Sequence, residues 1–148
     1  MDTAWDARGR WMKLLEPCLP YLDIFLPAVE EARMITDAET VEEIAKILID
    51  KGVKIVGLKM GKEGCYIRTK SKKIRIPAYP VEVIDTTGAG DAFVAGFLTG
   101  ILKKWSLEKT GRLANAAGAL STTAIGATGG LISLKKTLEF MNKFFLTF

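Results

Sequence analysis

Two short apolar runs on either side of an amphipathic segment constrain the fold more than any other feature of this chain. Residues 23–27 and 53–58 contain continuous apolar runs, as expected of parallel strands that are buried on both faces. The segment between them, residues 37–51, carries apolar side chains at helical spacing, and its Thr40 and Glu43 form a capping-box pattern. A helix between two buried strands predicts a βαβ unit and therefore a parallel sheet.

The other segments predict a β-hairpin and further helices. Residues 65–69 and 73–77 are separated by a lysine-rich turn and predict two strands with a solvated tip. Gly96 and Gly100, four residues apart in an apolar segment, predict close packing of one helix against a neighbour. Helices are expected at residues 12–16, 28–32, 92–102, 107–125 and 134–145, the last two capped by Ser106 and Ser133.

The junction at residues 85–93, Asp-Thr-Thr-Gly-Ala-Gly-Asp-Ala-Phe, suggests a functional site. It joins a predicted strand at residues 81–84 to a predicted helix, so backbone N–H groups and the helix dipole converge there on an anion such as phosphate. Beside phosphate, the carboxylate of Asp91 makes chemical sense as a base for an attacking hydroxyl. The simpler alternative is that Asp85 or Asp91 caps a helix and that the glycines permit a tight turn.

This junction resembles the C-terminal signature of the PfkB (ribokinase-like) carbohydrate kinases. The resemblance implies that Asp91 is the catalytic base and that the amides of Gly88, Ala89 and Gly90 form an anion hole. It implies an α/β fold, a three-layer ribokinase-like sandwich with a mostly parallel sheet. The chain, residues 1–148, would be the nucleotide-binding and catalytic C-terminal half, without the N-terminal half that supplies most of the sugar pocket and the lid.

The same resemblance assigns metal ligands. Asp85 and Thr87 would join carbonyls of the glycine-containing loop at residues 126–130 around a potassium ion, as in many family members. The alternative for Asp85 is ordinary turn chemistry, and both interpretations are compatible. Glu31 matches the acidic residue that organises magnesium and the phosphates, although Ala28 stands where the family has an asparagine. Glu31 near a helix start also complements the helix dipole.

Residues expected to border the nucleotide follow from weaker matches. Gly61 and Gly64 match a turn of that family, and Lys59 replaces its threonine. Lys59 either meets a phosphate as a point charge or is a solvated lysine at a strand end. Asn115 falls where the family has a polar residue near the adenine, and the small residues around it favour tight helix packing. Residues 1–6 resemble a family loop that follows a central strand.

Composition excludes several other classes of protein. The chain has 148 residues, 49% of them hydrophobic and 26% charged, which is typical of a globular protein. The absence of histidine removes histidine-based triads and nearly all zinc enzymes. Cys18 and Cys65 have no CxxC partner, so we expect two small core thiols in a reducing compartment. No apolar run approaches the length of a membrane span, which predicts a cytoplasmic protein without a membrane partner.

These observations predict a kinase that transfers a phosphoryl group from ATP, with Mg²⁺ and K⁺, to a hydroxyl of a small sugar. The alternative is a truncated, non-catalytic remnant that binds nucleotide. The net charge of +4 comes without basic residues interleaved with aromatic ones, which disfavours nucleic acid as a partner. Because several family strands are missing, we expect apolar surface of the sheet face and of helices to lie open, and a homo-oligomer or another partner to cover it.

Overall fold

The computed structural model describes residues 1–3, 6, 8–131 and 133–144. The chain divides into two compact units. The first, here called the sheet unit, comprises Met1–Met60 and Cys65–Arg75, and the second, the helical unit, comprises Gly61–Gly64 and Ile76–Phe148.

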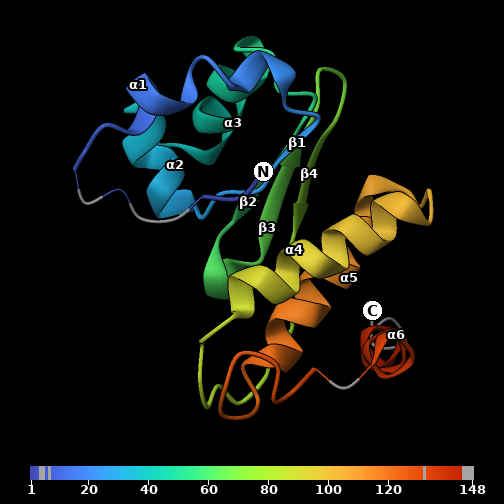
Figure 1. Ribbon diagram of the computed structural model, residues 1–148. Helices are drawn as coiled ribbons and strands as arrows, with labels where there is room; N and C mark the ends of the chain where they lie inside the picture. Colours follow the sequence, from blue (N-terminus) through green and yellow to red (C-terminus); the bar gives the residue numbers. More distant parts are fainter. Residues whose placement is uncertain (4–5, 7, 132, 145–148) are drawn as a thin grey trace. The chain divides into compact units, whose positions relative to one another are not determined.

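A four-stranded sheet in the order β1-β2-β3-β4 forms the centre of the sheet unit (Figure 1). The parallel pair and the hairpin that the sequence predicts are both present, and the hairpin continues the same sheet. Ile24 of β1 lies opposite Ile55 of β2 in the parallel pair, and β2 runs antiparallel to β3. The strands are β1 (Ile24–Phe25), β2 (Ile55–Lys59), β3 (Cys65–Arg68) and β4 (Lys73–Ile76).

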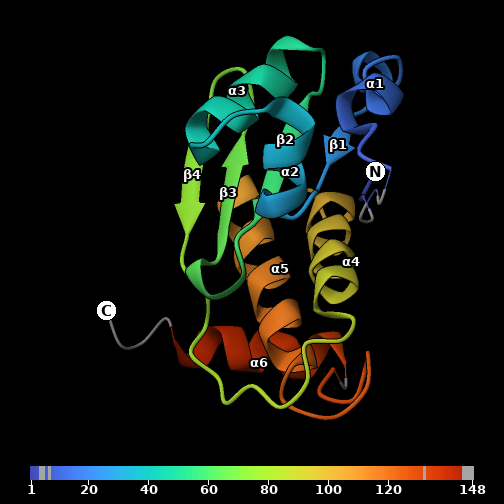
Figure 2. The same cartoon turned by 90° about the vertical axis from the view of Figure 1, so that its left-hand side faces the viewer.

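Helices pack on this sheet and enclose its apolar core (Figure 2). The Thr40 hydroxyl accepts the N–H of Glu43, so the predicted cap of α3 is confirmed. Asp37 belongs instead to the end of α2, as its C-cap with φ 53°. The core side chains Phe25, Ile44 and Leu48 are completely buried. The helices are α1 (Trp11–Leu15), the 3₁₀-helix η1 (Leu19–Tyr21), α2 (Val29–Thr36) and α3 (Val41–Asp50).

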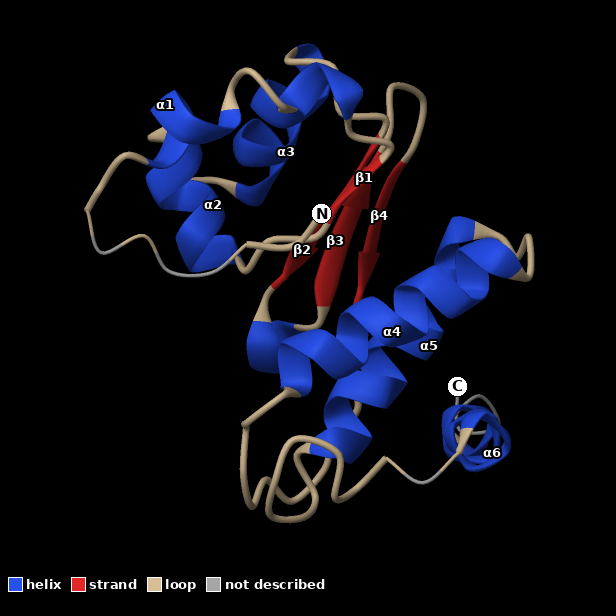
Figure 3. Ribbon diagram, in the orientation of Figure 1, coloured by secondary structure: helices blue, strands red, loops and turns tan. Residues whose placement is uncertain are grey.

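Two helices in close contact organise the helical unit, α4 (Ala89–Leu102) and α5 (Leu107–Ser121) (Figure 3). A Cβ atom added to Gly96 would lie 2.9 Å from the Cα of Ala114, and one added to Gly100 would lie 2.6 Å from the Thr110 hydroxyl oxygen. The predicted role of the two glycines in helix packing is therefore confirmed. The unit also contains η2 (Gly61–Glu63) and α6 (Leu134–Lys143), which Ser133 caps.

The predicted strand at residues 81–84 is wrong, because these residues are irregular. Val83 and Ile84 are 58% and 59% exposed, so no packing surface favours an extended pair there. The N–H groups of Ile84 and Asp85 instead donate to one carbonyl, that of Thr122. The helix expected to reach residue 125 ends at Ser121, and the Thr122 carbonyl therefore serves this loop rather than a longer helix.

The expected exposed sheet face is not found in the described strands. Val56, Leu58 and Ile67 of β2 and β3 are at most 1% exposed, whereas α4 exposes Leu98 and Leu102 at 43% and 82%. The expected open apolar surface is therefore present on a helix but not on these central strands, because α4 is apolar nearly all round and α5 covers only one side of it.

Three smaller expectations have different outcomes. Cys65 is buried as predicted, but Cys18 is exposed in the turn between α1 and η1, so its prediction as a core residue is wrong. The final helix, expected to reach residue 145, ends at Lys143, and residues 145–148 lie outside the described residues. Among the described residues, no helix has the length and apolar character needed to cross a membrane.

Candidate functional site

The carboxylate of Asp85 joins two loops of the helical unit. Its Oδ1 accepts the N–H of Thr87 at 2.9 Å, and its Oδ2 accepts the N–H of Gly126 at 2.8 Å. Both hydrogen bonds stabilise the ionised carboxylate and so hold the pKa of Asp85 below its ordinary value, and the bond from Gly126 has the larger effect. Asp85 therefore combines the turn chemistry predicted from sequence with a connection to a loop 41 residues away.

Gly88 brings the same two loops into direct contact. It is the N-cap of α4 and has φ +75°, a conformation that favours glycine. A Cβ atom at Gly88 would lie 2.6 Å from the Cβ of Ala127 and 2.7 Å from its carbonyl oxygen. Only a residue without a side chain fits, so the second glycine-containing loop fixes where α4 begins.

The first turn of α4 contains Gly90 and Asp91. The N–H of Ala89 donates to the carbonyl of Thr86 at 3.2 Å, so this amide closes a turn instead of pointing outward unused. The amides of Gly88 and Gly90 are then the better anion-hole candidates of the predicted three. The side chain of Asp91 is exposed, and no described residue forms a hydrogen bond or ion pair with it.

The predicted potassium ligands lie in this loop pair. Asp85 is ionised and each of its oxygens accepts one hydrogen bond, which leaves lone pairs for a cation. The Thr87 hydroxyl and backbone carbonyls of residues 126–130 would add further oxygens, and an all-oxygen set suits a hard cation. Among the described residues, no group of three or more His, Cys, Asp or Glu side chains could hold a metal by itself.

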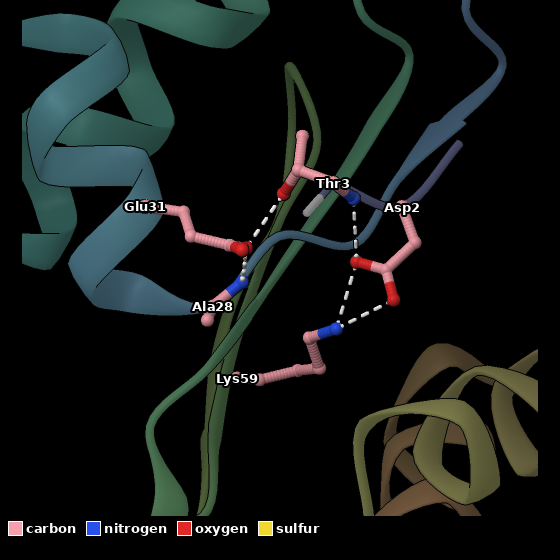
Figure 4. A network of polar contacts seen from close by, with 5 residues as sticks. All are labelled: Asp2, Thr3, Ala28, Glu31 and Lys59. Carbon is pink, nitrogen blue, oxygen red and sulfur yellow. Dashed lines mark hydrogen bonds and ion pairs between the residues drawn. The ribbon is translucent and has the colours of Figure 1, made fainter. Parts of the chain in front are cut away.

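A second polar cluster lies in the sheet unit, where the chain start meets the ends of β1 and β2 (Figure 4). The Lys59 ammonium lies 2.7 Å from both carboxylate oxygens of Asp2. These side chains are 15% and 25% exposed, so the ion pair is largely shielded from solvent. Lys59 is therefore not the solvated lysine that one interpretation of the sequence predicted.

Glu31 of this cluster supports the local fold. Its Oε2 accepts the Thr3 hydroxyl at 2.7 Å and the N–H of Ala28 at 3.1 Å. Ala28 is the N-cap of α2 but has no side-chain oxygen that could accept a backbone N–H, and Glu31 instead accepts the N–H of Ala28 itself. The predicted role of Glu31 at the helix start is thus present in the structure, and its magnesium role stays a prediction.

Backbone hydrogen bonds place Asp2 and Thr3 in this cluster. The amino group of Met1 donates to the Ile24 carbonyl at 2.7 Å, and the N–H of Leu26 donates to the Met1 carbonyl at 3.0 Å. Met1 therefore lies beside β1 in a parallel arrangement. Sequence reasoning missed Asp2 and Thr3 as partners of Lys59 and Glu31, although residues 1–6 resembled a loop that follows a strand.

The other predicted nucleotide residues come together in the helical unit. Gly61 and Gly64 have φ 54° and 91°, and the Gly64 N–H donates to the Gly61 carbonyl. Asn115 of α5 is 7% exposed, and its Nδ2 donates to the carbonyls of Ile76 and Pro77 at 3.1 and 2.9 Å. Asn115 thus holds the backbone connector after β4, a structural role that its position in the sequence did not reveal.

Comparison with known proteins identifies relatives for nearly the whole chain. Residues 1–133 match the family described as pfkB family carbohydrate kinase. An uncharacterized sugar kinase of Archaeoglobus fulgidus is 40% identical over 130 residues, which cover 88% of this chain and 52% of that protein. The chain spans about half the length of the curated relatives it matches.

Solved structures agree with these relatives. A protein assigned as a ribokinase II from E. coli, in complex with ATP and Mg²⁺, gives a TM-score of 0.82 at 28% identity, covering 88% of this chain and 42% of that one. Aminoimidazole riboside kinase from Salmonella enterica, complexed with aminoimidazole riboside and an ATP analog, gives 0.83 at 27% identity, covering 95% and 50%. The predicted ribokinase-like α/β fold is therefore confirmed.

Proposed function

Because this chain belongs to the pfkB family of carbohydrate kinases, we propose that it transfers a phosphoryl group from ATP to a hydroxyl of a sugar or sugar-like substrate. Residues 1–148 would form the nucleotide-binding and catalytic half of such a kinase. The observation that carries the proposal is the exposed Asp91 carboxylate in the first turn of α4, which no described residue engages.

In the proposed reaction, Asp91 takes the proton of the substrate hydroxyl as its oxygen attacks the γ-phosphorus in line. The new O–P bond forms while the bond from phosphorus to the β-phosphate oxygen breaks, and ADP leaves with that electron pair. Charge builds on the transferred group during this step. The amides of Gly88 and Gly90, with the positive end of α4 behind them, would stabilise that charge.

Bound cations would reduce the negative charge of the phosphates further. Asp85 and Thr87 are proposed to hold potassium, and Glu31 is proposed to organise the Mg²⁺ that accompanies ATP. Lys59 is proposed to meet a phosphate, which requires it to share or exchange its contact with Asp2. The paired state of Lys59 and Glu31 therefore predicts a lower nucleotide affinity than two unengaged side chains would give.

Titration calorimetry of the chain with MgATP, with and without potassium, tests nucleotide binding first. An assay of sugar-dependent ADP formation then compares the wild type with Asp91→Asn. We expect the variant to bind MgATP but to lose turnover by about 10²- to 10⁴-fold, because the amide is not a base. Asp50→Asn, an exposed aspartate of α3, is the matched control and should keep turnover. Unchanged turnover in Asp91→Asn would refute the assignment of the base.

A second candidate function is a nucleotide-binding remnant without catalysis. It is favoured by Ala28, which stands where the family has an asparagine. This alternative predicts that the chain binds MgATP but forms no ADP in the presence of any sugar, and that the wild type and Asp91→Asn behave equally.

Either candidate leaves the apolar side chains of α4 exposed, and we propose that a second copy or another protein covers Leu98 and Leu102.

A further inference from the structure

We propose that Asn115 is a positioning residue that fixes the Gly61–Gly64 turn through the connector backbone at residues 76–78. This role differs from the nucleotide contact expected from sequence. The inference rests on the proposed function only where it concerns what the turn binds. The positioning itself concerns contacts within the helical unit and is testable without a ligand.

Asn115 directs its side-chain amide at two backbone carbonyls of the connector. The side chain is 7% exposed, and its single Nδ2 group donates to the carbonyls of both Ile76 and Pro77. An amide nitrogen has two hydrogens, so these two bonds use its full donor capacity. The donors of Asn115 are therefore committed to protein backbone and not to a bound base.

The connector in turn lies against the Gly61–Gly64 turn. A Cβ atom at Gly64 would lie 2.0 Å from the Ile76 carbonyl oxygen and 2.6 Å from both the Pro77 carbonyl carbon and the Ala78 nitrogen. The Gly64 backbone therefore rests directly on the segment that Asn115 holds. The Ile76 carbonyl oxygen takes part in both contacts, since it accepts from Asn115 and faces Gly64.

A displacement of the connector must consequently displace the turn. Without Asn115 the two carbonyls lose their donors in a buried site, and the connector moves toward water or another donor. Gly64 has φ +91° and lies in close contact with the connector, so it must move when the connector moves. A misplacement of about 1 Å can lower an enzyme's rate by about two orders of magnitude. Asn115 would therefore influence nucleotide binding without contacting the nucleotide.

Hydrogen exchange measured by mass spectrometry on the whole chain tests the positioning. The variants are Asn115→Leu, which removes the donors, and Asn115→Ser, which leaves space for a bridging water if the first variant does not fold. We expect exchange at residues 61–66 and 76–80 to rise about tenfold in both variants. Ser121→Ala is the control, because its buried hydroxyl bonds only to a carbonyl of its own helix. Faster exchange at residues 76–80 alone would overturn the inference.

MgATP and MgGTP affinities provide the second arm. A positioning role predicts that Asn115→Ser weakens both nucleotides by a similar factor, about tenfold, and that their affinity ratio is preserved. A selective loss for ATP would overturn the inference in favour of a direct base contact. If the wild type binds neither nucleotide, the proposed function fails, while the exchange experiment still decides the role of Asn115.

Discussion

The two polar clusters of this protein differ in whether their charged side chains have partners. In the sheet unit, Lys59 is matched by Asp2 and Glu31 by Thr3 and a backbone amide. In the helical unit, each carboxylate oxygen of Asp85 accepts one hydrogen bond, but Asp91 in the first turn of α4 has no hydrogen-bond or ion-pair partner among the described residues. Our proposal that Asp91 is the base uses this difference, because a base needs a carboxylate that is open to substrate. The paired groups of the sheet unit (Asp2, Thr3, Glu31 and Lys59), here called the clamp, instead hold the chain start.

The largest expected effect is loss of the constraint that supports Asp91. Gly88→Ala should destabilise the protein by about 3 kcal/mol, because the residue would combine a positive φ with a collision against Ala127. Chemical denaturation measures the change. Gly126→Ala is the matched control: φ there is +89° but nothing lies within 4 Å of the added Cβ, so about 1 kcal/mol is expected. Equal costs would mean that the loop contact does not matter.

Breaking the Asp2–Lys59 ion pair of the clamp should lower the free energy of unfolding by a smaller amount. Lys59→Met leaves Asp2 partly buried without its cation, and we expect a loss of about 2 kcal/mol in the free energy of unfolding. Lys46→Met, which breaks an exposed pair with Asp50, should change stability by less than about 0.5 kcal/mol. If the two variants are equally stable, the shielded pair does not hold the chain start.

A smaller effect is expected from the second half of the clamp. Thr3→Val keeps the shape of the side chain but removes the donor to Glu31, which should cost about 1 kcal/mol. The hydroxyl of Thr36 donates to the carbonyl of Ala32 within α2. Thr36→Val should therefore change the free energy of unfolding by only a few tenths of a kcal/mol. Combining Thr3→Val with Lys59→Met in a double-mutant cycle shows whether the clamp acts as one unit, since non-additive changes indicate coupling.

The smallest expected effect is a pH dependence from Asp85. Its pKa is lower in the folded chain than in the unfolded chain because Gly126 and Thr87 donate to it. The contribution is fully present above the unfolded value of 3.8 and is lost as the pH falls through the folded pKa. Urea midpoints measured from neutral pH into acid should therefore decline less steeply for Asp85→Asn than for the wild type. Parallel curves would show that the two hydrogen bonds are not important in solution.

Much of the local structure was predictable because its causes lie within a few residues. Thr40 caps α3, Ser133 caps α6, and the hairpin forms where alternating residues flank a turn. Gly96 and Gly100 indicated the close helix pair because their spacing lies on one helix face. The predicted strand at residues 81–84 was wrong because its cause is not local. A β-branched run becomes a strand only when a neighbouring strand pairs with it.

The sequence by itself determined the family, the parallel and hairpin pairings, and the junction that places Asp91 in the first turn of a helix. Only the tertiary structure decided which groups are engaged. Asp2 meets Lys59 across 57 positions, Asp85 meets Gly126 across 41, and Asn115 meets Ile76 across 39. Such pairings depend on how strands and loops converge in space, and no local pattern encodes a hydrogen bond between residues so far apart in the chain.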